Sequence, residues 1–291
     1  MDPKTVTYAV ISPVRDEEKH LKAAIESVIR QTMRPAKWII VNDGSTDATG
    51  AIIDGYAAQF SWIRGLHRPN RGFRKSGGGV VEAFNDGLQA VACPDWEFLV
   101  KLDGDLEFEP DYFEKCFTYF AHDPALGIGG GTICYVENGI KRFERTPAFH
   151  VRGATKIYRR ACWEGLGGLW PAPGWDTLDE VKANMLGWTT RTFDDLHLIH
   201  HRLTGSADGF WGGFVKNGRA NYISGYHPLY MLAKCLSRLR GRQGALAAMA
   251  LFYGFISGYF KRLPQVNDPR LIGYLRRQQL NRLCGRETIW R

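Results

Sequence analysis

Short apolar runs alternate with segments of helical periodicity along the first hundred residues. The strand-like runs are residues 6–12, 38–42, 63–67 and 96–102. Between them, apolar residues recur at helical spacing over residues 17–31, 51–60 and 79–91. Strands that alternate with helices predict a mixed, mostly parallel sheet with right-handed crossovers, so the fold class is α/β. In such sheets ligands bind beyond the carboxyl ends of the strands.

The periodicity is weaker after residue 105. We expect a helix at residues 111–120, a glycine cluster at 127–131, and short helices with Gly, Trp and Pro turns over 153–205. From residue 227 onward the chain has long helical segments with basic flanks. This change of texture predicts two parts, residues 1–225 and a basic, helical extension at residues 226–291.

The net charge of +8 is concentrated in that extension. Twelve Lys and Arg residues stand against two acidic ones between residues 234 and 291, so the preceding residues are slightly negative. Residues 244–260 carry no charge, but a helix of 17 residues is short for a bilayer core about 30 Å thick. Arg240, Arg242, Lys261 and Arg262 flank this segment, and residues 226–239 are amphipathic.

We therefore expect residues 226–262 to lie on an anionic membrane surface, on the inner face of the cytoplasmic membrane. The alternatives are an ordinary helical subdomain that packs on protein and, less favoured, a transmembrane hairpin. The six scattered cysteines and the polar residues 1–8 indicate a cytoplasmic protein with reduced thiols and no secretory signal. No nucleic-acid-binding motif accompanies the basic charge, so nucleic acid is not an expected partner.

Two carboxylates end the apolar run at residues 96–102. Asp103 and Asp105 are separated by Gly104, where the backbone bends freely, so both side chains can turn toward one hard cation. Mg²⁺ or Mn²⁺ bound in this way keeps coordination positions open for phosphate oxygens and neutralises charge on a leaving diphosphate. An Asp-Gly-Asp is also an ordinary strand-to-turn junction.

Three earlier turns follow strands of the predicted sheet. Residues 12–18 (Ser-Pro-Val-Arg-Asp-Glu-Glu) lead into a helix. Acidic residues are favourable at the N-terminus of a helix, which is an ordinary explanation for Asp16 and Glu17. In residues 42–49, Asp43 either turns the chain or contacts a nucleotide, and Asp47 or Thr46 caps the next helix. Residues 71–79 are basic and glycine-rich, and their amides with Arg74 and Lys75 form a candidate diphosphate cradle.

In order and spacing, these four turns resemble those of the family 2 glycosyltransferases, inverting enzymes with a GT-A (Rossmann-like) fold and nucleotide-sugar donors. The resemblance covers about the first two thirds of the chain. Three departures occur: Asp16 stands where Asn is frequent, Asn42 replaces the first Asp of the second motif, and glycines 77–79 lengthen the third turn. The resemblance implies a GT-A catalytic domain at 1–225, with a nucleotide-sugar-binding half at 1–105 and an acceptor-binding half at 106–225.

The resemblance also implies roles for individual residues. The nucleotide-sugar contacts would be Pro13, Val14, Arg15, Asp16, Asp43, Lys75, Asp103 and Gly104. Asp105 would bind the metal together with Asp103, and either His200 or His201 would complete the metal or phosphate site. The cofactor would be Mg²⁺ or Mn²⁺, and a UDP-sugar is the family's commonest donor.

Inversion requires one general base that deprotonates the acceptor hydroxyl as it attacks. The family places this base in an acidic motif, usually Glu-Asp, about a dozen residues before a Gly-aromatic pair. Aligned on Gly187-Trp188, the base position is Asp176, with Trp175 in place of the usual Glu. Asp179 is the alternative base, and Asp176 has a competing interpretation as a helix cap.

The sequence thus predicts metal-assisted transfer of a sugar from a nucleotide-diphosphate sugar to a hydroxyl of a glycan or lipid-linked acceptor, as in bacterial polysaccharide assembly. One alternative is a sugar-phosphate nucleotidyltransferase, but the glycine-rich signature typical of that class is missing after the first strand. The other is a catalytically inactive relative that binds nucleotide sugars.

Overall fold

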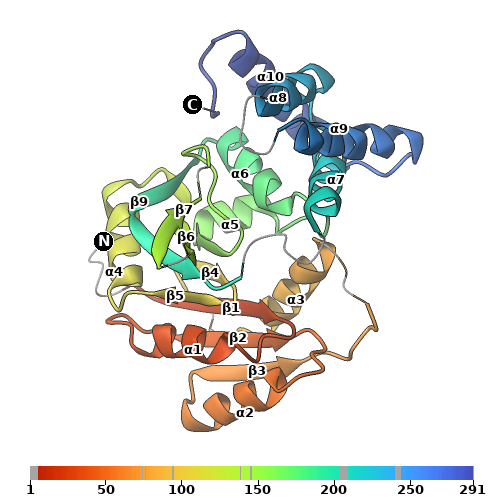
Figure 1. Cartoon of the computed structure of the whole chain (residues 1–291). Coiled ribbons are helices and arrows are strands. Elements are labelled where there is room, and N and C mark those ends of the chain that lie inside the picture. The colour runs from red at the N-terminus through yellow and green to blue at the C-terminus, as the bar shows by residue number, and fades with distance from the viewer. Residues whose placement is uncertain are drawn as a thin grey trace.

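The computed structural model of the chain (Figure 1) describes residues 6–73, 75, 77–93, 95–137, 139–144, 146–202, 209–239 and 244–290. Its centre is one mixed sheet with the strand order β3-β2-β1-β4-β8-β6-β9-β5, and β7 pairs with β6 beside this path. Helices cover both faces of the sheet (Figure 1). The mixed α/β fold with flanking helices confirms the expected GT-A architecture.

The first half is the parallel part of the sheet. Strands β3, β2, β1 and β4 pair in parallel, as predicted. The elements in chain order are β1 (Tyr8–Val14), α1 (Leu21–Ile29), β2 (Lys37–Asn42), α2 (Thr49–Gln59), β3 (Ile63–His67), α3 (Gly78–Gln89) and β4 (Phe98–Leu102). The carboxyl ends of β1, β2 and β4 therefore lie side by side at one edge.

The second half is mostly antiparallel. Strand β8 pairs antiparallel with both β4 and β6, β5 pairs antiparallel with β9, and β6 runs parallel to β9. The elements are β5 (Leu106–Phe108), α4 (Tyr112–His122), β6 (Leu126–Glu137), β7 (Ile140–Phe143), β8 (Thr155–Arg159), α5 (Arg160–Leu166), α6 (Trp175–Met185) and β9 (Thr189–His200).

The glycine cluster at residues 127–131 is part of the central strand β6 and not an irregular segment. A Cβ atom on Gly129 would lie 2.6 Å from the ring of Phe193, and one on Gly130 would lie 2.4 Å from the carbonyl oxygen of Thr155. Glycine is needed here because neighbouring elements approach the strand more closely than any side chain allows.

Two apolar clusters pack on opposite faces of the sheet. In β1, Tyr8 and Val10 face one cluster, while Ala9 and Ile11 face the other, as the two-residue repeat of a strand requires. Because both faces are buried, the parallel strands read as continuous apolar runs.

The C-terminal part consists of α7 (Gly209–Ile223), α8 (Pro228–Leu239), α9 (Gly244–Phe260) and α10 (Pro269–Leu283). These helices gather beyond α6 (Figure 1), and a third apolar cluster joins Leu178 and Val181 of α6 to Leu271 of α10. Helices α7 and α9 approach so closely that a Cβ on Gly218 would lie 2.1 Å from the Leu251 carbonyl oxygen. None of the helices in the described ranges is both long and apolar enough to cross a membrane.

Candidate functional site

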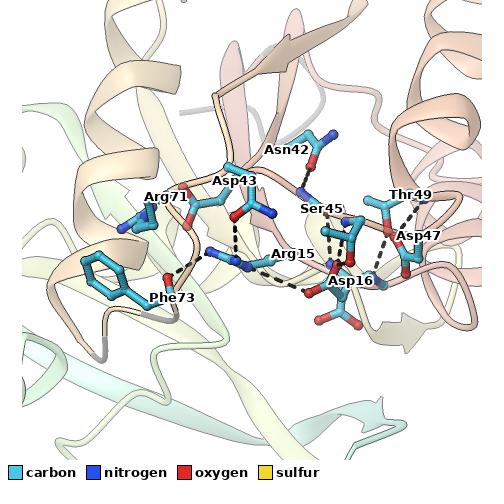
Figure 2. A network of polar contacts seen from close by, with 12 residues as sticks. Arg15, Asp16, Asn42, Asp43, Ser45, Asp47, Thr49, Arg71 and Phe73 are labelled. Atoms are coloured by element: carbon cyan, nitrogen blue, oxygen red, sulfur yellow. Dashed lines mark hydrogen bonds and ion pairs between the residues drawn. The ribbon is translucent and has the colours of Figure 1, made fainter.

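The turns after β1 and β2 are joined by reciprocal hydrogen bonds (Figure 2). The Asp16 carboxylate accepts from the Thr46 amide at 2.8 Å, and the Asp16 amide donates to the Ser45 hydroxyl at 3.0 Å. One residue on, the Glu17 amide donates to Thr49 Oγ1 at 2.8 Å. Asp16 has a φ of +54°, a conformation that Asp and Asn adopt more readily than most residues. The side chain of Asp16 thus holds the second turn against the first.

Asn42, which replaces the family's Asp, uses both ends of its amide. Its Oδ1 accepts from the Ser45 amide at 2.9 Å, and its Nδ2 lies 3.1 Å from Nδ1 of His67. A carboxylate has no proton to donate to that imidazole nitrogen. Asp47 accepts from the Glu18 amide at 3.1 Å and the Thr49 amide at 3.0 Å, and these bonds lower its pKa although burial alone would raise it.

Asp43 faces the basic segment that follows β3. Its carboxylate pairs with both Arg68 and Arg71, and Arg68 also pairs with Asp86 at 2.8 Å. Arg15 of the first turn donates to the carbonyl oxygen of Phe73 at 3.1 Å, so the basic segment is held against the first two turns (Figure 2). Asp43 and Arg15 therefore both contact residues of the third turn.

The third turn is anchored by Lys75 and its glycines. Lys75 pairs with Glu82 of α3, which lowers the pKa of that carboxylate. A Cβ on Gly77 would lie 2.7 Å from Pro173, and one on Gly78 would lie 2.6 Å from the carbonyl oxygen of Pro171. The extra glycines of this chain thus bring the third turn against the loop that precedes α6. Arg74 and Ser76 of the predicted cradle lie outside the described residues.

Asp103 and Asp105 emerge beyond the end of β4, as expected. Asp103 pairs with the buried Lys101, yet burial raises its pKa. The carboxylate of Asp105 lies 3.2 Å from His200 Nε2 and 3.5 Å from Arg202 Nε. A Cβ on Gly104 would lie 2.5 Å from a methyl of Val14, so the glycine between the carboxylates is also a packing requirement.

Only one of the two candidate histidines faces this pair. His200 contacts Asp105, and this contact raises the pKa of the imidazole although burial alone would lower it. His201 instead lies 2.7 Å from Glu107 and stacks on His20 with 5.2 Å between ring centroids. Neighbouring residues of an extended strand end point to opposite sides, which explains the separation.

Carboxylate oxygens and imidazole nitrogens are donors that a divalent cation accepts, and Asp105 and His200 bring one of each together. No group of three or more His, Cys, Asp or Glu side chains in the described ranges forms a complete metal site. Asp105 and His200 supply an oxygen and a nitrogen ligand suited to Mn²⁺, and Mg²⁺ or Mn²⁺ bound with a nucleotide takes its remaining ligands from phosphate and water. Nearby, Glu17 pairs with Arg202 through one oxygen, while its buried Oε2 has no hydrogen-bond partner within the described part of the chain.

Asp176 lies in the first turn of α6, next to a buried lysine. Lys156 of β8 donates to the Asp176 carbonyl oxygen and lies 2.8 Å from both Asp179 and Glu180. Burial raises the pKa of Asp179 to about 6 despite this ammonium, and Tyr158 donates to the same carboxylate at 2.6 Å. Asp179 is 1% exposed and lies within the protein interior.

Cations surround the Asp176 carboxylate. Burial alone would raise its pKa, but the charges of His150, Lys156 and Arg152 lower it. His150 is held by Glu180 at 2.8 Å. Trp175, which stands where the family has Glu, lies with its ring 5.6 Å from the Lys101 ammonium and 5.5 Å from that of Lys156. The indole therefore joins the Asp103 region to the α6 region.

Sequence reasoning missed three cationic residues of this arrangement: Lys101, Lys156 and Arg202. The available signal was Lys101 inside the apolar run of β4, since Lys is almost never fully buried unless it is paired, whereas β8 (Thr-Lys-Ile-Tyr-Arg) does not stand out as apolar. Arg202 gave no signal, because its partners Glu17 and Asp105 are remote in sequence.

Comparison with known proteins identifies the family. The model of Glycosyl transferase family 2 matches residues 9–172, more than half of the chain. The chain belongs to glycosyl transferase family 2. This family membership does not support the nucleotidyltransferase alternative.

Relatives of this family 2 chain include proteins from several bacteria. The putative glycosyltransferase EpsH of Bacillus subtilis is 33% identical over 208 residues, which are 65% of this chain and 57% of EpsH. Glycosyltransferase GlyG of Streptococcus pneumoniae is 31% identical over 130 residues, 45% of this chain and 40% of GlyG. The chain spans about half the length of the curated relatives that it matches.

Solved structures share the fold at low sequence identity. The mannosyltransferase PcManGT of Pyrobaculum calidifontis, in complex with GDP-Man and Mn²⁺, superposes with a TM-score of 0.58 and 15% identity, over 99% of this chain and 78% of that one. S. aureus TarS 1-349 in complex with UDP-GlcNAc gives a TM-score of 0.56 and 15% identity, over 93% and 80% of the two chains.

Proposed function

We propose that this chain is an inverting glycosyltransferase that moves a sugar from a nucleotide-diphosphate sugar, most simply a UDP-sugar, to an acceptor hydroxyl. The observation that carries this proposal is the convergence of the acidic and basic turns after β1, β2, β3 and β4 at one edge of the sheet. Ligands of α/β sheets bind at this edge, and amides and cations there suit phosphate. Family membership and nucleotide-bound structural neighbours support the same donor class.

The donor contacts follow from the order of the turns. In this proposal Pro13, Val14 and Asp43 line the base and ribose pocket, with Arg15 and Asp16 holding its walls together. Lys75 lies near the diphosphate, and Asp103 with Gly104 lies near the ribose or the transferred sugar.

Asp105 and His200 would hold a divalent cation, with Asp103 close by. The cation, Mg²⁺ or Mn²⁺, would neutralise the negative charge that develops on the leaving diphosphate. We assign this role to His200 and not to His201, because Glu107 and His20 engage the latter.

Asp176 is the proposed base. The nearby cations keep it ionised at neutral pH, the form that accepts a proton. The acceptor hydroxyl gives its proton to Asp176 while its oxygen bonds to the anomeric carbon, and the bond to the diphosphate breaks with its electron pair on the leaving oxygen. Asp179 acts as a positioning residue in this scheme, since it is buried against Lys156.

Binding and donor hydrolysis test these roles together. UDP-, GDP- and dTDP-sugars with Mn²⁺ are titrated calorimetrically into the wild type, Asp105→Ala, Asp176→Asn and the exposed control Asp111→Asn. We expect Asp105→Ala to lose metal-dependent donor binding, and Asp176→Asn to bind donor but turn over at least 100-fold more slowly. A wild type that binds donor without turnover would support the inactive-relative alternative, and one that binds no nucleotide sugar would refute the proposal.

We further propose that an anionic membrane surface on the cytoplasmic side is a partner and that the acceptor is lipid-linked. On α8, Leu229, Leu232, Leu236 and Leu239 follow helical spacing and are each 45–58% exposed. On α9, Phe260 is 84% exposed beside Lys261 and Arg262. Exposed apolar side chains next to basic ones suit a surface of anionic lipid. Arg240 and Arg242, part of the expected basic flank, lie outside the described residues.

Vesicle co-sedimentation tests this surface. The wild type should sediment with vesicles containing 30% phosphatidylglycerol and less with pure phosphatidylcholine. Leu232→Asp with Leu236→Asp should abolish sedimentation, while the exposed control Val136→Asp on β6 should not. Equal sedimentation of all variants would refute the membrane surface, and loss of a dimer in the double variant would assign the face to a second copy of the chain.

A further inference from the structure

A hollow of about 550 Å³ lies between the end of β7, the middle of β9 and the segment with Glu144, Thr146 and Ala148. Its volume is in the range of small-molecule sites, ~300–1,000 Å³. None of the donor-site residues assigned above lines it. It is therefore a separate recess on the half of the chain that follows β5.

An irregularity in β9 shapes this hollow. Phe193 pairs with Gly131 of β6, but the next residue of β6, Thr132, pairs with His197. Residues 194–196 are thus left out of the ladder and bulge from the sheet. Bulges re-aim side chains and are frequent beside active sites. Here the bulge places Asp194 and His197 in the wall of the hollow.

The threonine hydroxyls of the wall have already used their protons. Thr132 donates to the carbonyl oxygen of Phe193 at 3.1 Å, and Thr146 and Thr192 donate to that of His150 at 3.3 Å and 2.7 Å. Carbonyl oxygens only accept, and a hydroxyl has one proton, so these groups offer a ligand only lone pairs.

Within the described part of the chain, the remaining polar side chains of the wall offer acceptors too. His197 Nε2 lies 3.0 Å from the carbonyl oxygen of Asp194 and must donate to it, so the proton of this nitrogen is already used. Glu144 and Asp194 add carboxylates. Phe143 is 46% exposed, with its ring centroid 4.7 Å from that of His197, and presents an apolar aromatic surface.

Two residues connect the wall of this hollow to the surroundings of the proposed base. Glu144 pairs with Arg152 at 2.6 Å, and Arg152 is one of the cations that lower the pKa of Asp176. The floor of the hollow, through the carbonyl of His150, continues to the imidazole that pairs with Glu180 of α6. Arg152 and His150 thus connect the wall of the hollow to the first two turns of α6, where the proposed base lies.

We propose that this hollow binds a neutral, hydroxyl-rich sugar unit of the acceptor, adjacent to the unit that receives the transferred sugar. Sugar hydroxyls supply the donors that a wall of acceptors needs, and the C–H face of a pyranose packs on an aromatic ring such as Phe143. A uronate or phosphorylated sugar is disfavoured, because its charge meets the carboxylate of Asp194. The inference rests on the proposed glycosyl transfer and specifies its acceptor.

Saturation-transfer NMR without donor or metal tests the inference, with neutral disaccharides and their uronate-containing counterparts as probes. We expect the wild type to bind a neutral disaccharide, and Phe143→Ala and Asp194→Lys to weaken this binding at least tenfold. Ile140→Ala, at an exposed apolar residue of the same strand β7 that does not line the hollow, is the control and should bind like the wild type. Asp194→Lys should gain binding of the uronate.

Three results would overturn the inference: no neutral disaccharide binds, the uronate binds better to the wild type, or Phe143→Ala and Asp194→Lys bind as the wild type does. Circular dichroism of each variant separates lost binding from lost folding, and Ile140→Ala with Asp194→Lys keeps the test informative if Phe143→Ala does not fold. The proposed function fails separately, because donor binding is measured on the wild type without saccharide.

Discussion

Replacing Lys156 with methionine should destabilise the folded chain by about 3–5 kcal/mol at pH 8. The lysine side chain is fully buried, and its ammonium lies 2.8 Å from a carboxylate oxygen of both Asp179 and Glu180. Methionine fills a similar volume, so the change removes the charge with little loss of packing. Two neighbouring carboxylates would then remain buried without their shared cation.

The expected magnitude follows from opposing electrostatic effects. At an effective dielectric constant of about 20, each carboxylate attracts an ammonium about 4 Å away by ~4 kcal/mol. Desolvation of the buried ammonium offsets several kcal/mol of this gain. The net loss agrees with the typical cost of removing one partner from a buried ion pair.

The loss of folding stability in Lys156→Met should depend on pH, and the protonation of Asp179 determines whether it grows or shrinks as the pH falls. Burial raises the pKa of this carboxyl to about 6 in the folded chain, above its value in the unfolded chain. A raised carboxyl pKa favours the folded state at low pH, and this contribution is lost as the pH rises from about 4 to about 6. Without Lys156 the pKa rises further, so protonation relieves the charge and the variant should be less impaired at pH 5 than at pH 8.

Urea unfolding followed by tryptophan fluorescence at pH 8 and pH 5 measures both effects. Lys115→Met, which breaks an exposed pair with Asp111, is the matched control and should leave the unfolding free energy nearly unchanged. Adding Asp179→Asn to Lys156→Met should restore part of the stability. A Lys156→Met variant within 1 kcal/mol of the wild type at pH 8, or equally impaired at both pH values, would refute the reasoning.

Three further predictions concern packing, capping and thiol access. Gly130→Ala should destabilise the chain by about 1–3 kcal/mol in the urea assay, because its Cβ would lie 2.4 Å from a backbone carbonyl oxygen of β8. Gly55→Ala, in open space on α2, should instead stabilise the chain by about 0.5–1 kcal/mol in the same assay. Asp268→Ala removes the N-cap bond of α10 at 3.0 Å and should cost about 1 kcal/mol by thermal or urea unfolding. With Ellman's reagent the exposed Cys284 should react first, while Cys162, buried with its pKa raised to about 12, should react only after unfolding.

The pattern of apolar residues predicted the parallel half of the fold because each of its strands is visible from its own sequence. The expected strand at residues 63–67 and the expected helix at 244–260 have the bounds of β3 and α9. β1 and β4 are continuous apolar runs since both of their faces are covered. These patterns need no knowledge of remote residues.

Strand β6 was not predictable in the same way. Its glycines have low strand propensity, and they are required by groups from remote parts of the chain, among them α4, α5, β8 and β9. The same non-local cause hides the partners of the site. The acidic turns are visible in sequence, but Lys156 meets Asp179 across 23 residues, and Arg202 meets Glu17 across 185.

The contacts of Asp16 and Asn42 explain why this chain can depart from the family pattern at these two turn positions. Asp16 supplies an acceptor to a backbone amide, a task that the more frequent Asn also performs, and Asn42 adds a donor bond to His67 that Asp lacks. Both residues therefore preserve the hydrogen bonds of the first two turns, and neither change alters the charge of the proposed metal ligand Asp105 or the proposed base Asp176. Asp105 and Asp176 instead face cationic side chains and not a neighbouring turn. Under the proposed function, the chemistry depends on the latter pair, while Asp16 joins the first two turns and Asn42 closes the second.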